Sequence, residues 1–372
     1  MTRPRVAVVE PYLARYRVPL YRQLAVDLRA RGVDLVVAHG QATGAQARRT
    51  DGVSVPGAVV LRQRSLRVGR RELLWRELGE LASSVDVLVL DQALRNLENH
   101  LWLGRRRGPA VALFGHGGTY TVAQGRLARA AKRGMTRGAD WFFAYTDAGG
   151  EDVVRDGFPR ARVTVVRNAV DTGEVAGARE RVTEREMAEF RARHGLVVGR
   201  TCLFLGGFDA AKRIPLLVAA VERIERQLPG FRLLMAGDGE LRELVRGASA
   251  VVDLGPVARA EDKALLGAVS ELLLMPGRVG LCAVDSFALR TPVVTAEWPF
   301  HSVEFEYLEH GRNAWVVRGG EREFAAAVVE LLRDGERVER LRAGCVEDAA
   351  RYTVEGMSER FADGLERLLA LR

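Results

Sequence analysis

Cysteine and lysine are scarce in this 372-residue sequence, which has only three of each. Cys202, Cys282 and Cys345 show no CxxC spacing, so a disulfide scaffold is excluded and free thiols in a reducing compartment are favoured. No apolar run reaches the roughly 18 residues of a membrane span, and the N-terminus has no signal-peptide pattern. We therefore expect a cytoplasmic protein and leave contact with the inner membrane face open.

Common catalytic motifs are missing as well. No GxGxxG follows the first apolar run, which argues against a dinucleotide-dependent oxidoreductase, and no GxxxxGK[ST] points to a P-loop NTPase. The GxSxG elbow of α/β hydrolases, HExxH and an acidic DxD pair after a strand are also absent. We expect neither a metal nor a cofactor.

Positive charge is concentrated in the first part of the chain. The formal net charge is +8, but residues 1–170 hold 28 basic and 15 acidic residues, a net of +13, and the remainder has a net of −5. Such a basic part attracts nucleic acid, anionic lipid or a phosphorylated small molecule, and charge alone does not choose among them. The length and the ordinary globular composition predict two folded domains.

Short apolar runs alternate with longer amphipathic stretches, the pattern of a βαβ series. Strands are expected at 6–9, 33–38, 85–90, 110–114 and 141–145, with helices at 18–31, 70–83, 94–107 and 125–137. After a polar segment at 170–199, predicted as a linker and one helix, strands resume at 202–205, 231–236, 250–254, 272–275 and 293–295, and a last helix covers 354–371. The fold class is α/β, with two doubly wound domains that meet near residue 170.

Ligands of an open parallel sheet bind beyond the carboxyl ends of its strands. One loop there has Gly206 and Gly207 followed by Lys212 and Arg213, which indicates either an anion site or a tight turn with a solvated cation pair. Another begins a helix at Gly280–Cys282, where backbone amides form a phosphate nest. Asp285 in that helix accepts from a ribose diol, or simply favours the helix dipole.

Two loops of the first domain also carry functional groups. His116 follows a strand and lies among three glycines, where it can contact a ligand hydroxyl, although most loop histidines do not. Arg15 and Arg17 flank Tyr16 in the first loop, where they bind an anion or lie on the surface. On the stretch 125–141, Arg126, Arg129 and Arg133 share one helical face, which is either a dock for anionic lipid or a solvated basic face.

The loops of the second half together resemble the retaining GT-B glycosyltransferases of family GT4. The shared features are Gly206-Gly207-Phe208 through Lys212, the Ala236–Glu240 segment AGDGE, the Gly280–Val294 segment, and Arg167–Asp171 in place of PNGVD. The resemblance is strong over about residues 165–320 and loose before them. It implies a GT-B fold, two Rossmann-like domains facing across a cleft: 1–170 binds the acceptor, 171–353 binds a nucleotide sugar, and helix 354–372 packs back on the first.

The resemblance also implies residue roles. Lys212 contacts the donor diphosphate, the amides of Gly280 and Leu281 hold its phosphates, and Asp285 replaces the second glutamate of E-x7-E on the ribose. His116 lies next to the donor sugar, so His116 and Lys212 are the expected catalytic residues. The remaining donor contacts are Gly206, Gly207, Arg213, Gly237, Gly255, Val257, Arg278 and Glu304, and the acceptor contacts are Arg15, Arg17 and Tyr120.

Two features depart from the family pattern. Gly207 occupies the place of the arginine that precedes the lysine, and Arg213 or Arg278 is the nearest replacement. The first glutamate of E-x7-E has no equivalent, because the loop is shortened to Pro276–Gly280. Glu304 or Glu306 supplies a carboxylate instead, although a solvated helix start is the favoured interpretation of both.

The expected reaction is metal-independent transfer of a hexosyl group, with retention, from a UDP-, GDP- or dTDP-linked sugar to an acceptor hydroxyl. The acceptor is a glycan, a lipid-linked molecule or a small natural product. One alternative is a nucleotide-sugar epimerase of the same architecture. The other is a non-enzymatic nucleic-acid-binding protein that uses the basic half, which the lack of aromatics among its arginines argues against.

Overall fold

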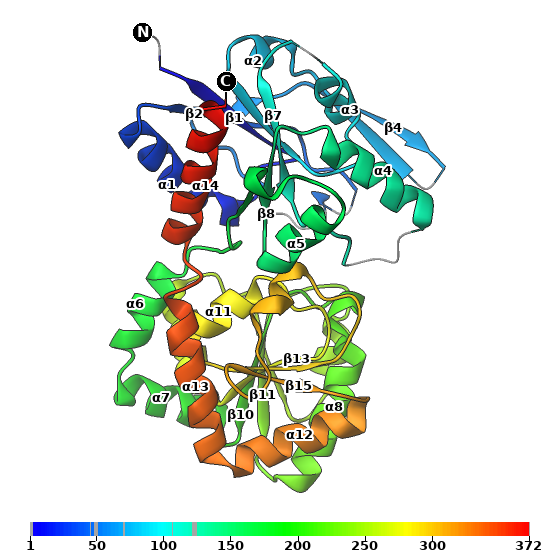
Figure 1. Ribbon diagram of the computed structural model, residues 1–372. Coiled ribbons are helices and arrows are strands. Elements are labelled where there is room, and N and C mark those ends of the chain that lie inside the picture. Colours follow the sequence, from blue (N-terminus) through cyan, green and yellow to red (C-terminus); the bar gives the residue numbers. More distant parts are fainter. Residues whose placement is uncertain are drawn as a thin grey trace. The chain divides into compact units, whose positions relative to one another are not determined.

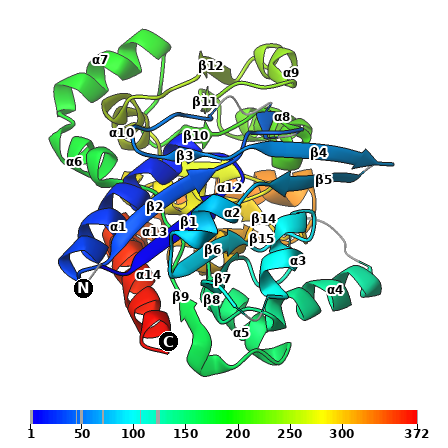
Figure 2. The same ribbon diagram turned by 90° about the horizontal axis from the view of Figure 1, so that it is seen from above.

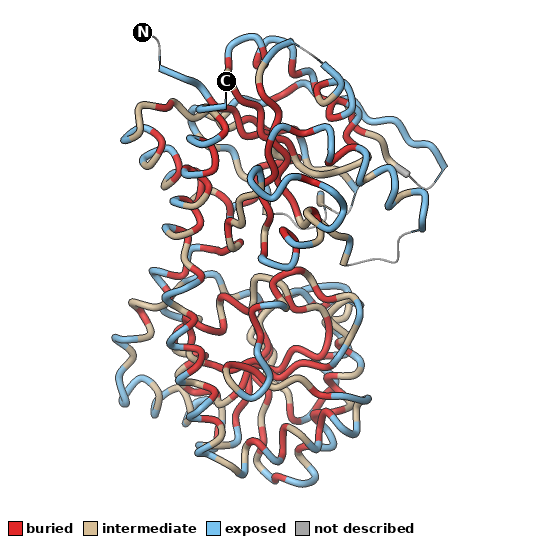
Figure 3. Tube along the Cα trace, in the orientation of Figure 1, coloured by how far each residue is buried: buried red, intermediate tan, exposed pale blue. Residues whose placement is uncertain are grey.

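The computed structural model describes residues 3–44, 46–47, 51–69, 71–105, 107–120 and 125–371. The chain forms two compact units (Figure 1). The N-terminal unit comprises Met1–Asp171 together with Val354–Arg372, and the C-terminal unit comprises Thr172–Thr353. Each unit has its own sheet and its own buried core, as the burial colours of Figure 3 show.

The N-terminal unit is built on a parallel seven-stranded sheet of order β3-β2-β1-β6-β7-β8-β9. Its strands are β1 (Arg5–Glu10), β2 (Asp34–His39), β3 (Val59–Val60), β6 (Val87–Asp91), β7 (Ala110–Gly115), β8 (Trp141–Ala144) and β9 (Val163–Val165). Its helices are α1 (Val18–Ala30), α2 (Gly79–Ser83), α3 (Leu97–Leu103), α4 (Arg126–Arg137), α5 (Asp147–Arg155) and α14 (Val354–Leu369). The central strands are continuously apolar because helices cover both of their faces.

A β-hairpin replaces most of the helix that was predicted for residues 70–83. Strand β4 (Gln63–Val68) pairs antiparallel with β5 (Arg71–Arg76), and only α2 in this stretch is helical. The prediction was wrong because ELLW has apolar residues that fit a helical period as well as a strand, whereas the structure buries alternate residues, Leu74 and Arg76. Gly69, with φ +60°, supplies the turn. Figure 2 shows the hairpin extending beyond the main sheet.

The C-terminal unit has a parallel six-stranded sheet of order β12-β11-β10-β13-β14-β15. Its strands are β10 (Thr201–Leu205), β11 (Arg232–Ala236), β12 (Val251–Gly255), β13 (Leu272–Met275), β14 (Val293–Ala296) and β15 (Ala314–Val317). Its helices are α6 (Gly173–Arg181), α7 (Glu184–His194), α8 (Ile214–Gln227), α9 (Arg242–Arg246), α10 (Ala260–Ala268), α11 (Cys282–Leu289), α12 (Glu321–Arg333) and α13 (Gly335–Ala349).

Two helices, α6 and α7, occupy the segment for which a linker and one helix were predicted. Val182 and Thr183 separate the two helices. Thr183 caps α7 in a capping box, in which its hydroxyl accepts from the Glu186 amide and the Glu186 carboxylate accepts from the Thr183 amide. Gly195, with φ +60°, ends α7. The polar composition of this segment therefore reflects solvated helices rather than a linker.

The last helix, α14, lies beside α1 in the N-terminal unit (Figure 1). In sequence, the 182 residues of the C-terminal unit separate α14 from the rest of the N-terminal unit. The Phe361 ring packs on Phe143 with ring centroids 4.3 Å apart, and Arg31, the residue that follows α1, pairs with Asp363 at 2.6 Å. Gly364 lies so close to the sheet that a Cβ there would be 2.4 Å from the Phe143 ring. Helix α14 is thus an integral part of the N-terminal core.

Candidate functional site

Glycines let the first two loops of the C-terminal sheet cross at close range. A Cβ on Gly237, after β11, would lie 1.9 Å from the carbonyl oxygen of Gly206, after β10. Gly206 itself has φ +149° and donates its amide to the Ala236 carbonyl at 3.1 Å. The Gly237 amide in turn donates to the Gly255 carbonyl, at the end of β12, at 2.9 Å. Three of the predicted donor-site glycines therefore form one continuous edge.

Lys212 and Arg213 both reach the loop that follows β13. Asp209 caps the short turn Ala210–Lys212, and the ammonium of Lys212 donates to the Arg278 carbonyl at 2.6 Å. The Arg213 guanidinium donates to the Pro276 carbonyl at 3.4 Å, from a residue with φ +55°. The structure thus brings the predicted cation pair against the Pro276–Gly280 loop, which leads through the N-cap residue Leu281 into α11.

Gly277 explains why the shortened loop has no counterpart of the first glutamate. A Cβ at this position would lie 2.3 Å from the backbone carbon of Lys212 and 2.5 Å from the Ala211 carbonyl oxygen. These are backbone atoms, which cannot move aside as the end of a flexible side chain can. The approach of the Lys212 turn therefore leaves room for no side chain at residue 277.

Asp285 and Glu304 both follow Gly280 in the sequence and provide the acidic groups of this region. Burial raises the pKa of Asp285, and Lys263 opposes that shift. Glu304 is buried, 4% exposed, and its carboxylate lies 3.8 Å from the position of a Cβ on Gly280, whereas Glu306 is exposed. The interpretation as a solvated helix start therefore holds for Glu306 and is wrong for Glu304.

His301 is a part of this region that the sequence analysis did not identify. Its Nδ1 accepts from the Val279 amide at 3.0 Å, and its Nε2 donates to the Ala296 carbonyl at 2.9 Å. Burial lowers its pKa, which favours the neutral ring that this pair of hydrogen bonds requires. His301 therefore fastens the Pro276–Gly280 loop to the end of β14, and no sequence motif announces such a tertiary contact.

Val257 lies in the loop that follows strand β12. It is half-buried, two residues after Gly255, whose φ of +68° turns the chain away from β12. Asp253 in β12 pairs with Arg242 at 3.0 Å and with Arg246 at 3.2 Å, which fixes α9 beside the same strand.

A second group of functional side chains lies at the carboxyl edge of the N-terminal sheet. His116 after β7 contacts Tyr145 after β8 edge-on, with ring centroids 4.7 Å apart. Lys132 of α4 donates to the Gly118 carbonyl at 2.6 Å. A small pocket of about 150 Å³ is lined by Asp91, Gln92, Gly115, His116, Lys132 and Tyr145. Asp91 and Lys132 are additions to the predicted site.

Burial sets the protonation states in this pocket. It raises the pKa of Asp91 to about 6, with help from Glu10, and lowers the pKa of His116 to about 4, with help from Lys132 and Arg17. Burial also lowers the pKa of Lys132 to about 8. At neutral pH the pocket therefore presents a neutral imidazole that donates one hydrogen bond and accepts one, between an anion and a cation.

The three predicted acceptor residues differ in exposure. Arg15 is exposed, and the Tyr120 hydroxyl donates to Asp152 at 2.7 Å. Arg17 is buried, donates to the Asn168 side chain at 2.7 Å and lies 5.2 Å from the Tyr145 ring centroid. The interpretation of Arg17 as a surface residue is therefore wrong. Arg17 ties the first loop to the RNAVD segment and to the wall of the His116 pocket.

The arginines of α4 lie at the surface. Arg126, Arg129 and Arg133 line a polar depression together with Asp156, which is 3.6 Å from Arg133. Leu127 is 88% exposed between them. Among the described residues, no helix is both long and apolar enough to span a bilayer, and no group of acidic, histidine or cysteine side chains is arranged to hold a metal ion.

Replacing Asp91 by asparagine should raise the melting temperature of the protein more at pH 8 than at pH 5. Because folding raises the pKa of Asp91 from 3.8 to about 6, this carboxyl contributes stability below its unfolded pKa, and that stability is lost as the pH rises through 6. Asparagine stays neutral and avoids the loss. Differential scanning calorimetry of both proteins at the two pH values measures the difference. Asp34→Asn, whose side chain is 48% exposed, is the control, and equal effects of Asp91→Asn at both pH values would contradict the prediction.

Comparison with known proteins agrees with this architecture. Residues 199–334 match the family model described as glycosyl transferases group 1, and residues 20–174 match the model of glycosyltransferase family 4. The D-inositol 3-phosphate glycosyltransferase of Thermobispora bispora is 30% identical over 234 residues, which cover 56% of this chain and 52% of that protein. The chain thus matches about half the length of this curated relative.

Similar solved structures cover nearly the whole chain. Anabaena HepE in complex with UDP has a TM-score of 0.68 at 14% identity, over 98% of this chain and 100% of that one. A putative UDP-N-acetylglucosamine 2-epimerase from Listeria monocytogenes has a TM-score of 0.63 at 13% identity, over 100% and 98%. At such identities the likeness concerns the fold, which is GT-B, with two parallel α/β sheets.

The family matches cover both units, one model for each, and they remove the reason for the non-enzymatic nucleic-acid-binding alternative. With its two parallel sheets, its GT-B neighbours and these matches, the chain belongs to the family 4 glycosyltransferases, the glycosyl transferases group 1.

Proposed function

We propose that this enzyme transfers a hexosyl group, with retention and without a metal, from a nucleoside-diphosphate sugar to an acceptor hydroxyl. The observation that carries the proposal is the convergence of Lys212 and Arg213 on the Pro276–Gly280 loop at the start of α11. Fixed cations and helix-terminal amides stabilise the charge that develops on the leaving diphosphate. The C1–O bond to the diphosphate breaks as the C1–O bond to the acceptor forms, and a phosphate oxygen takes the acceptor's proton.

The donor is assigned to the C-terminal unit. We propose Lys212 as the catalytic cation, Asp285 on the ribose, Leu281 on a phosphate, and Val257 against the base. Glu304 is the acidic group of the loop, since it is the buried one. The other proposed donor contacts are Gly206, Gly207, Arg213, Gly237, Gly255, Arg278 and Gly280. UDP is the first nucleotide to test, because the HepE structure is a complex with UDP.

The acceptor is assigned to the N-terminal unit. Arg15 and Tyr120 are its proposed contacts, and His116 hydrogen-bonds the donor sugar as a neutral imidazole. Arg17 is buried, so we propose that it positions the first loop and Tyr145. The exposed face of Arg126, Leu127 and Arg133 supports peripheral contact with an anionic membrane from a cytoplasmic location. Flotation with and without anionic lipid tests that contact.

A thermal-shift panel of UDP, GDP, dTDP and ADP tests the proposal. A ligand that binds only the folded state stabilises that state by about 2.7 kcal/mol when its concentration is about 100 times its dissociation constant. We therefore expect a clear rise of the melting temperature with one nucleotide of the panel, UDP. If no nucleotide raises it, the proposed function is contradicted. The Listeria neighbour makes epimerisation the alternative to exclude, and NMR of a UDP-sugar incubated without acceptor distinguishes an epimer from hydrolysed sugar.

A further inference from the structure

Strand β2 is less well covered than its neighbour β1. Residues Val6–Val9 of β1 are at most 2% exposed, whereas Leu35 and Val37 of β2 are only half-buried. The cause is the connection from β2 to β3, residues 40–58, in which the described part contains no α-helix. A crossover helix normally covers such a strand. Among the described elements, α1 packs on β2, and the described loop residues 51–58 lie beside it.

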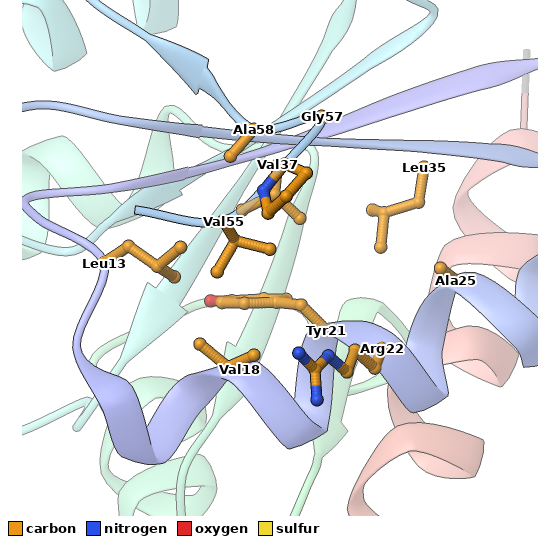
Figure 4. A pocket seen from close by; sticks show the side chains of 11 residues that line it. Leu13, Val18, Tyr21, Arg22, Ala25, Leu35, Val37, Val55, Gly57 and Ala58 are labelled. Carbon is orange, nitrogen blue, oxygen red and sulfur yellow. The ribbon is translucent and has the colours of Figure 1, made fainter. Parts of the chain in front are cut away.

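The uncovered face forms an apolar pocket of about 210 Å³ (Figure 4). In the figure the Tyr21 ring lies between Val18 on one side and Val37 and Val55 on the other. Leu13, Leu35 and Ala58 are further walls. An apolar cavity of about 150 Å³ is already large enough to hold benzene, so this one accepts a group about the size of naphthalene or a branched alkyl chain.

One charged side chain lines the pocket, the exposed Arg22 of α1. Within the described part of the chain it makes no hydrogen bond or ion pair. Since the other lining residues are uncharged, the pocket joins an apolar interior to a single cation. That arrangement complements a molecule with a compact apolar group and an acidic group beside it.

We propose that this pocket is a binding site for the apolar group of a small anionic amphiphile, with Arg22 paired to its acid. The proposal does not depend on the reaction proposed above. The pocket is nevertheless connected to the first loop, because the Tyr21 ring forms its wall and the Tyr21 hydroxyl donates to Glu10 at the end of β1. Two sources share this ligand chemistry, the non-sugar part of an acceptor and a separate ligand that is not glycosylated.

Binding of naphthalene-2-sulfonate to the full chain, measured by isothermal titration calorimetry, tests the site. Ala58→Phe fills the pocket from a half-buried loop position and should weaken binding at least ten-fold. Arg22→Gln should weaken the sulfonate about three-fold, as expected of an exposed ion pair, and leave the neutral naphthalene-2-sulfonamide unchanged. Arg29→Gln, one exposed arginine further along α1 and outside the pocket lining, should change neither.

Absence of sulfonate binding, or binding that Ala58→Phe leaves intact, would overturn the proposal, and Val55→Trp as a second filling variant guards against an unfolded first one. An equal effect of Arg22→Gln and Arg29→Gln would overturn the role of Arg22. Incubation with 6-hydroxynaphthalene-2-sulfonate and UDP-glucose separates the two sources. A glucosylated product, in which the naphthol oxygen replaces UDP at C1 and its proton leaves with UDP, assigns the pocket to the acceptor. Bound but unmodified probe assigns it to the separate ligand.

Discussion

Replacement of Lys212 by alanine should lower the turnover number about 100-fold, the effect of losing one strong preorganised electrostatic contact. The Lys212 ammonium already lies 2.6 Å from the Arg278 carbonyl, at the loop that we assign to the diphosphate. Because charge on the leaving phosphate grows as the C1–O bond breaks, the loss should fall on turnover more than on nucleotide affinity. Steady-state rates of sugar transfer or of slow donor hydrolysis, with UDP binding measured in parallel, give both quantities.

Two further variants make this result specific. Lys212→Arg keeps the charge and should recover part of the rate, although the guanidinium has a different shape. Arg226→Ala removes a cation from the exposed end of α8 and should leave turnover unchanged. Near wild-type turnover of Lys212→Ala would sink its assignment, and an equal loss in Arg226→Ala would mean that net charge rather than position matters.

Replacement of Glu98 by alanine should destabilise the N-terminal unit by about 3–5 kcal/mol, because it leaves a buried guanidinium without its partner. Arg76 of β5 and Glu98 of α3 are both 0% exposed, and their side chains approach to 2.5 Å. Arg76 also donates to the Glu10 carbonyl at 3.0 Å, so the pair joins the hairpin to the end of β1. In hydrogen exchange followed by mass spectrometry, the variant should exchange faster than the wild type in β6 and β7, and the increase should be smaller in β13 of the other unit.

The matched control removes both charges. Arg76→Met with Glu98→Leu has similar volume and no buried ion, so it should be close to wild type in stability. Exchange is followed peptide by peptide because it reports on the N-terminal unit separately from the C-terminal unit. Slow exchange of β6 in Glu98→Ala would contradict the prediction. So would a double variant as unstable as the single one.

The parallel sheets could be predicted from the sequence because their strands are buried on both faces. Runs such as Val6–Val9 and Leu272–Met275 have no polar residue, and they are too short for a helix, so their length favours a buried strand. Strands β3, β5 and β9 lack this signal and were missed, and β15 was missed although its run AWVV has it. Val59 and Val60 of β3 are exposed at the sheet edge, β9 is three residues long, and β5 shares its pattern with a helix. The edge and the hairpin depend on pairing partners that local sequence does not contain.

The site divides in the same way. Loops with glycines and cations after strands are local features, so the Gly206–Arg213 and Gly280–Asp285 segments could be selected as candidates from the sequence. Asp91, Lys132 and His301 could not be selected. Each is an ordinary residue in its own segment, and only the packing of β6, α4 and β14 against other loops gives it a role.

Helix α14 makes the first unit the last to be finished during synthesis. The ribosome completes all of 172–353 before it makes the helix that covers Phe143, which at about 5–20 residues per second takes on the order of ten seconds or more. The continuous C-terminal unit can fold during that time, while the earlier sheet waits with an apolar face open to water and to other nascent chains. Chaperones would therefore meet this protein at its N-terminal sheet.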